Sequence, residues 1–207
     1  MVSIELENIA KVFNRQVIFK NITYRFEEGK KYAIHGSNGS GKSTLLQIVS
    51  GFLSADKGTC TYNTAQGPLK IEEVSEHIAI CSPSAEFFQD MSLKEALEFH
   101  FQFKDLLHFA SLSELLLYLG FKPYQSHEKL RNFSSGMLQK LKLGVALFSN
   151  TPILLLDEPC MNLDEQNRIW YKHNIPNFTQ NRLVIIASND PFETSFCEKS
   201  LNIMDFK

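Results

Sequence analysis

The chain has 207 residues, a length that suits one domain. Its 21 Lys and Arg and 23 Asp and Glu residues give a formal net charge of −2, which argues against a strongly basic nucleic-acid binder and against an acidic disordered tail. Apolar residues make up 43% of the chain, but no uncharged apolar run approaches the roughly 18 residues that a bilayer-spanning helix needs. Residues 1–7 show no basic region followed by an apolar stretch, so we expect a cytoplasmic protein.

The first third of the sequence is predicted to form strands interrupted by one helix. Apolar and polar residues alternate over residues 4–9, 17–26 and 31–34, with turn signals at Asn14 and Gly29. A glycine-rich turn after Gly36 leads into an apolar helix expected at 43–50. Strands are again expected at 57–64 and 76–81.

The middle third is predicted to be helical, with helices at 92–107, 111–119 and 135–148. Continuous apolar runs at 153–157 and 183–187 are typical of parallel strands buried on both faces, and the last strand is expected at 201–204. No repeat or long linker divides the chain. We therefore expect one α/β domain over residues 1–207, with a helical subdomain at about residues 84–149.

A phosphate-binding loop is predicted at residues 36–43, which match G-x-x-x-x-G-K-[ST] between a predicted strand and a predicted helix. Its glycines allow backbone N–H groups to curl around a phosphate, and the following helix adds unpaired donors. Lys42 would place its charge on the β- and γ-phosphates, Ser43 would ligate Mg²⁺, and Thr44 would contact the α-phosphate. The predicted nucleotide-binding residues here are Gly36, Ser37, Asn38, Gly39, Ser40, Gly41, Lys42, Ser43 and Thr44.

An acidic pair follows the apolar run at 153–156. Asp157 and Glu158 would lie at the carboxyl end of a buried strand, the edge where ligands bind in parallel sheets. This position predicts that Asp157 holds Mg²⁺ and that Glu158 acts on an attacking water. An exposed acidic turn is the alternative.

Three further segments, taken in order with the loop and the acidic pair, make the chain similar to the nucleotide-binding subunit of ATP-binding cassette (ABC) transporters. Residues 133–140 read Phe-Ser-Ser-Gly-Met-Leu-Gln-Lys, a variant of the L-S-G-G-Q signature; residues 161–164 resemble the D-loop; and residues 188–190 occupy the switch position. The resemblance implies a P-loop NTPase fold with a mixed sheet, an N-terminal antiparallel β lobe and a helical subdomain. It also implies ATP and Mg²⁺ as ligands and a Mg-dependent ATPase activity.

The resemblance assigns further residues. Ser134 and Gly136 of the signature would close over the ATP of a second nucleotide-binding subunit in a head-to-tail homodimer or heterodimer, although Ser134 also suits a plain helix cap. Phe13 matches the aromatic residue that stacks on adenine; Phe19 is the competing candidate, and Phe13 as core is the alternative.

The chain departs from the family pattern at several positions. No glutamine follows the strand expected at 76–81, and Gln89 lies too far along the chain to receive a site. The usual switch histidine is replaced by Asn189, whose amide can donate a hydrogen bond to a γ-phosphate but cannot accept and return a proton. Because Glu158 is present, we keep Glu158, Lys42 and Asn189 as catalytic residues and expect hydrolysis; the sequence leaves open whether these departures slow it.

Three functions fit the sequence. The first is the ATPase subunit of an ABC transporter, held at the inner face of the membrane by separate membrane-spanning partners, with the phenylalanines at 87, 88, 99, 101 and 103 either lining a groove for such a partner or filling a helix core. The second is a nucleotide-gated binding module with little hydrolysis. The third is an ABC ATPase that acts on nucleic acid or ribosomes, although neither a coiled-coil insertion nor a second cassette is found in these 207 residues. We expect no nucleic-acid partner.

Overall fold

The computed structural model describes residues 1–207, with strands and helices along the whole chain. The strands are β1 (Ser3–Phe13), β2 (Gln16–Glu27), β3 (Lys31–His35), β4 (Lys57–Thr64), β5 (Gly67–Pro68), β6 (Ile78–Cys81), β7 (Ile153–Asp157), β8 (Leu183–Ala187) and β9 (Lys199–Asn202). The α-helices are α1 (Lys42–Val49), α2 (Ile71–His77), α3 (Leu93–His100), α4 (Leu112–Tyr118), α5 (Ser135–Leu147), α6 (Glu165–Phe178) and α7 (Pro191–Thr194). Short 3₁₀ helices are η1 (Pro123–His127), η2 (Leu130–Asn132) and η3 (Ile203–Phe206).

The strands form two sheets. One is antiparallel, in the order β2-β1-β4-β5, and the other is parallel, in the order β6-β7-β8-β3-β9. The mixture of strand directions expected from the sequence is therefore divided between an N-terminal antiparallel sheet and a parallel sheet. This arrangement is the predicted α/β class.

The parallel sheet lies between two hydrophobic clusters. Successive residues of a strand point to opposite faces, so β7 contributes Ile153 and Leu155 to the cluster shared with the antiparallel sheet, and Leu154 and Leu156 to the cluster under the helices. All four side chains are fully buried. Burial on both faces explains why β7 reads as an unbroken apolar run.

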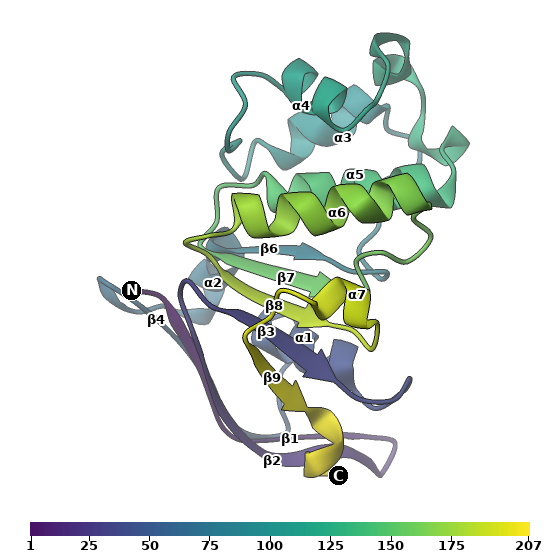
Figure 1. Cartoon of the computed structure of the whole chain (residues 1–207). Helices are drawn as coiled ribbons and strands as arrows, with labels where there is room; N and C mark the ends of the chain where they lie inside the picture. The colour runs from purple at the N-terminus through teal and green to yellow at the C-terminus, as the bar shows by residue number, and fades with distance from the viewer.

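Helices α5 and α6 run side by side across one face of the parallel sheet, and α3 and α4 lie beyond α5, far from β1 and β2 (Figure 1). The chain between β6 and β7 forms α3, α4 and α5, whereas α6 follows β7. The carboxyl terminus ends beside β1 and β2 (Figure 1). No helix of the structure has both the length and the apolar character needed to cross a bilayer.

Four predicted elements differ from the structure by two residues or more, and the first, the strand expected at 4–9, runs over Ser3–Phe13. The helix expected at 92–107 ends at His100, because Leu107 N–H donates to the Phe148 carbonyl and the chain there pairs with residues 148–150. The strand expected at 76–81 begins only at Ile78, opposite Ile153, since the residues before it belong to α2. The strand expected at 201–204 runs over Lys199–Asn202.

The last of these differences has a local cause. The Asn202 side chain accepts a hydrogen bond from Met204 N–H at 3.1 Å, which turns the chain out of β9 and into η3. Two helices, α6 and α7, and the short α2 and β5 were not expected at all. Helix α6 carries a polar sequence with Pro176 inside it, so its apolar periodicity is weak.

Candidate functional site

Three polar segments meet at the carboxyl edge of the parallel sheet. Strand β3 leads into the phosphate loop (residues 36–43), β7 ends at the acidic pair, and β8 leads into residues 188–190. These strands are adjacent, in the order β7-β8-β3, and all are parallel. Segments far apart in the sequence therefore share the edge where parallel sheets bind ligands.

The phosphate loop requires glycine at its tightest points. Gly41 has a φ of 104°, and a Cβ added there would lie 2.5 Å from Ile18 Cγ2. A Cβ on Gly36, whose φ is 151°, would lie 2.5 Å from Ile203 Cγ2. Helix α1 starts directly after Gly41, and no side chain caps its N-terminus. The first N–H groups of this helix are thus left for another acceptor.

Lys42 reaches back across the loop. Its Nζ donates to the carbonyls of Gly36 at 2.8 Å and Ser37 at 3.3 Å, and the residue is only 5% exposed. The ammonium group is therefore held against the loop backbone. It places a positive charge inside the turn where the loop N–H groups gather.

Ser43 and Asp157, the two predicted metal ligands, contact each other directly. Ser43 Oγ donates to Asp157 Oδ1 at 3.0 Å. Burial raises the pKa of Asp157, while the hydrogen bond from Ser43 opposes that rise. An oxygen-only pair fits Mg²⁺, which uses one or two protein oxygens together with water and phosphate oxygens, and no group of three or more His, Cys, Asp or Glu residues forms a separate metal cluster.

Glu158 follows Asp157 at the end of β7 and adopts a φ of 43°, which is unusual for a residue with a side chain. Its N–H donates to the Ala187 carbonyl at 3.0 Å, so the turn is tied to β8. Glu158 lines a cavity of about 240 Å³ together with Asn189 and Arg168. The carboxylate and the switch residue thus face the same small space.

Asn189 bridges the switch segment and the phosphate loop. Its Oδ1 accepts from Gly36 N–H at 3.1 Å, and its Nδ2 donates to Asn38 Oδ1 at 3.3 Å. The oxygen and the nitrogen of the Asn189 side-chain amide therefore both form hydrogen bonds with the loop. The structure places Asn189 beside the loop, where the resemblance puts it.

The signature residues lie in a different hollow. Ser134 caps α5, with its Oγ accepting from Met137 N–H at 3.3 Å, as the capping interpretation predicts. Gly136 packs so closely on the D-loop that a Cβ there would lie 2.8 Å from the Asn162 carbonyl. Ser134, Gly136 and Asn162 line a hollow of about 520 Å³ whose lining includes no residue of the phosphate loop. The signature and the loop of one chain are therefore separate.

The two adenine candidates differ in exposure. Phe13, at the end of β1, is 43% exposed, and Lys11 Nζ lies 5.2 Å from its ring centroid. Phe19 is fully buried and packs against Gly41. Only Phe13 is available to a ligand. Gln89 is exposed in a turn before α3, and the structure gives it no role at the site.

Several polar contacts at this edge were missed from the sequence. Glu193 is 4% exposed, and its Oε1 accepts from Cys160 N–H at 2.8 Å. Arg168 binds Asp190 at 2.6 Å, and buried Gln139 donates to the Pro159 carbonyl at 2.8 Å. The contacts of Glu193 and Gln139 connect the turn after the acidic pair to α7 and α5, and the Arg168–Asp190 pair connects α6 to the start of α7. The sequence held no distinct signal for them, because Gln139 stands beside the polar residues Lys140 and Lys142 in α5.

The fold and this edge define a P-loop nucleotide-binding protein. The ABC transporter family model matches residues 19–161, which is more than half of the chain, and the chain belongs to that family. It is an ATP-binding cassette of the family.

Known relatives and solved structures agree with this assignment. The chain is 27% identical to the linearmycin resistance ATP-binding protein LnrL of Bacillus subtilis, over 98% of this chain and 66% of LnrL. It is 30% identical to the ribosome protection protein VmlR of the same organism, over 96% of this chain and 33% of VmlR. The chain thus spans two thirds of the length of one relative and one third of the other.

Among solved structures, the bacterial ABC transporter cassette MJ0796 in its dimeric form has a TM-score of 0.80 at 21% identity, covering 97% of this chain and 94% of that one. A dimeric post-hydrolysis state of MJ0796 bound to ADP and Pi has a TM-score of 0.76, also at 21% identity, covering 96% and 93%. Both likenesses show the fold.

Proposed function

We propose that this chain binds Mg-ATP on the phosphate loop and hydrolyses it to power a transporter through separate membrane-spanning partners. The observation that carries the proposal is the meeting of the loop, the Ser43–Asp157 pair and Glu158 at one sheet edge. Family membership and the similarity to LnrL support the same assignment. The protein would then lie at the inner face of the membrane, held there by its partners.

Each residue of the site has its own role in the proposed reaction. The loop N–H groups and Lys42 bind the β- and γ-phosphates, which concentrates positive charge where negative charge develops during cleavage. Thr44 contacts the α-phosphate. Glu158 orients the attacking water and accepts its proton. Asn189, which cannot take a proton, donates a hydrogen bond to the γ-phosphate through Nδ2.

Ser43 and Asp157 would hold Mg²⁺. When bound, Mg²⁺ neutralises phosphate charge and orients the phosphate oxygens. The Ser43–Asp157 hydrogen bond keeps both oxygens at the same place beside the loop. Phe13, exposed at the end of β1, would stack on adenine.

The separation of the signature from the phosphate loop supports a dimer. Ser134 and Gly136 line a hollow apart from the loop of their own chain, so they would act on the ATP of a second subunit. The dimeric MJ0796 cassette has this chain's fold. We propose a head-to-tail homodimer or heterodimer on these grounds.

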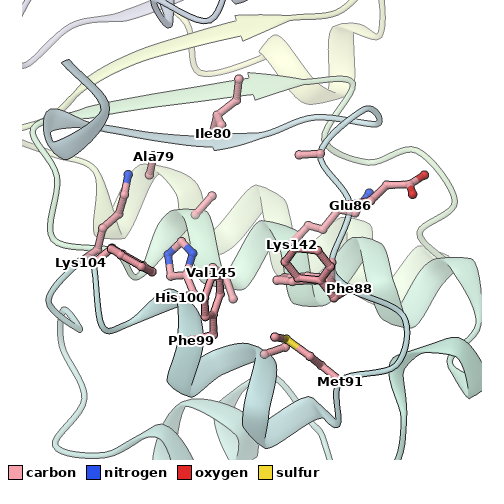
Figure 2. Close-up of a pocket in the computed structure, with 15 residues that line it drawn as sticks. Ala79, Ile80, Glu86, Phe88, Met91, Phe99, His100, Lys104, Lys142 and Val145 are labelled. Carbon is pink, nitrogen blue, oxygen red and sulfur yellow. The ribbon is translucent and has the colours of Figure 1, made fainter. Parts of the chain in front are cut away.

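An apolar groove between β6, α3 and α5 is our proposed contact for the membrane-spanning partner. This phenylalanine groove has a volume of about 380 Å³ and is lined mainly by apolar side chains, among them Phe87, Phe88, Met91, Phe99 and Phe103. Phe88 and Phe103 are each 67% exposed and belong to no core, whereas Phe87 and Phe101 are partly buried against the hydrophobic cluster under the helices. Figure 2 shows Lys104 and Lys142 at opposite ends of the groove, with Phe99 and His100 between them. Exposed aromatic rings beside cations suit an amphipathic partner segment.

Two other functions keep specific support. The missing loop glutamine and Asn189 favour a nucleotide-gated module with little hydrolysis. The 30% identity to VmlR favours a role at the ribosome. Binding of the purified chain to ribosomes, with no membrane subunit co-purifying with the chain, would favour the role at the ribosome.

Phosphate release tests the proposed hydrolysis. We compare the wild-type chain with Glu158→Gln at saturating Mg-ATP, and expect the variant to lose about 10²–10⁴-fold in rate while its ATP affinity stays the same. Glu165→Gln, an exposed acid at the start of α6, serves as the control and should hydrolyse ATP at the wild-type rate. A wild-type rate no higher than that of Glu158→Gln would contradict the enzyme and favour the gated module.

A further inference from the structure

The end of the chain lies against the outer side of the phosphate loop. After β9, the 3₁₀ helix η3 packs on β2 and β3, and Ile203 is fully buried. Ile203 Cγ2 occupies the space next to Gly36, and Ser37 Oγ donates to Met204 Sδ at 3.6 Å. The residues that follow β9 therefore contact the loop along its length.

Lys207 makes the most specific of these contacts. Its Nζ donates to the Ser40 carbonyl at 2.6 Å and to the Ile18 carbonyl of β2 at 2.7 Å. The loop is thus tied to the antiparallel sheet through one ammonium group. Ser40 is buried, and the hydrogen bond that its carbonyl accepts from Lys207 fixes the peptide between Ser40 and Gly41.

The geometry of a peptide bond converts this outer contact into an effect inside the loop. The Ser40 carbonyl and the Gly41 N–H belong to one trans peptide and point in opposite directions. A carbonyl held outward by Lys207 therefore holds the Gly41 N–H toward the interior of the loop. Gly41, with its φ of 104°, is flexible enough to let this peptide rotate if the carbonyl were released.

We propose that Lys207 is a positioning residue of the nucleotide site, which holds the Ser40–Gly41 peptide so that its N–H faces the bound phosphates. Lys42 and Lys207 then act on the loop from opposite sides: Lys42 binds the Gly36 and Ser37 carbonyls from within, and Lys207 binds the Ser40 carbonyl from outside. The inference rests on the proposed nucleotide site and adds a residue that lies outside every motif.

The test measures ATP and ADP affinity of the full chain with Lys207→Met, Lys207→Arg and Lys199→Met. Methionine keeps the length of the side chain and removes the donor, so we expect a three- to tenfold higher Kd for both nucleotides, roughly one lost charge-assisted hydrogen bond. Arginine restores a donor and should return the Kd to near the wild-type value. Lys199 is exposed on β9, and its variant controls for the change in net charge.

Two further measurements separate positioning from general stability. Because Lys207 touches no reacting atom, Lys207→Met should raise the KM for Mg-ATP and leave kcat unchanged. At saturating ADP, hydrogen exchange at the Gly41 amide should be faster in Lys207→Met than in wild type, while exchange in the β7 and β8 amides stays slow. A variant that had only lost overall stability would show faster hydrogen exchange in the β7 and β8 amides as well.

The possible outcomes decide between the two proposals. If wild-type chain binds neither ATP nor ADP, the proposed function fails. If wild type binds nucleotide and Lys207→Met binds it equally well, or if Lys207→Arg is as weak as Lys207→Met, the role given to Lys207 is wrong while the nucleotide site stands.

Discussion

The phosphate loop and the phenylalanine groove differ in what carries their chemistry. The loop presents backbone N–H groups, and its shape is held by glycines, by hydrogen bonds donated by Lys42 and Lys207, and by the bond that Asn189 accepts from Gly36 N–H. The groove presents side chains, mostly aromatic rings from separate elements. The comparison teaches that a site made of backbone depends on spacing within one segment, whereas a site made of side chains depends on how distant segments pack.

Removing the charge inside the loop should have the largest effect. Lys42→Ala deletes the ammonium that faces the phosphates and also frees the Gly36 and Ser37 carbonyls. We expect ATP affinity to fall about 100-fold or more, as charge-assisted hydrogen bonds are lost. Isothermal titration calorimetry with Mg-ATP measures this affinity. Lys57 is exposed on β4, and Lys57→Ala is the control. Micromolar binding by Lys42→Ala would remove the loop from the nucleotide site.

Substitutions in the groove should lower partner binding and leave ATP affinity unchanged, in contrast to Lys42→Ala. Phe88 and Phe103 are 67% exposed, so the double variant Phe88→Ala with Phe103→Ala should keep the fold and the ATP affinity of the isolated chain. Loss of two large rings from an interface should weaken partner association by about tenfold or more. Co-purification with the membrane-spanning subunit measures the effect, with exposed Phe52→Ala as the control. Unchanged recovery of the partner would show that the groove is not the contact.

The difference between the two regions also explains what the sequence could predict. The loop residues, the acidic pair and the order of the segments could be located by spacing, and the α/β P-loop fold expected from them is confirmed. Ser134 as a helix cap could be read locally, because a cap depends on residues three apart. The individual site roles remain predictions.

Features that depend on packing could not be predicted. The helix expected at 92–107 ends early because residues 105–107 pair with residues 148–150, more than forty positions away. Helix α6 was missed because its sequence is mostly polar and Pro176 lies inside it, although Asp164, read as part of the D-loop, also caps it. Lys207 belongs to no motif, and only the fold brings it to Ser40.

A smaller expected effect is the pH dependence of stability that a residue of the groove contributes. His100 lines the groove, contacts Ser149 Oγ at 2.8 Å, and has its pKa lowered to about 4 by burial and then by the charge of Lys104. The unfolded chain binds a proton on this residue near its ordinary pKa, while the folded chain does not. Stability from the neutral ring is therefore present above about pH 6.5 and is lost as the pH falls toward 4.

The His100 contribution should be about 1 kcal/mol between pH 7 and 5.5. Urea unfolding of wild type and His100→Gln at both pH values measures it, since glutamine keeps a donor but does not titrate. We expect the free energy of unfolding to fall by more in wild type than in the variant. Equal losses would show that the ring titrates normally in the folded chain.

The smallest change returns to the loop and asks whether Asn189 limits the rate. A neutral imidazole has one donor and one acceptor, so Asn189→His can keep the donor contact with Asn38 Oδ1, while its other ring nitrogen, in place of the contact with Gly36 N–H, can accept and return a proton. Because Glu158 already accepts the proton from water, we expect kcat to rise only about threefold to tenfold, with the Kd for ATP unchanged. Asn189→Ala, which loses both contacts, should fall below wild type. A histidine variant no faster than wild type would mean that proton handling at this position does not limit turnover, and that the loop contacts of the amide are its main role.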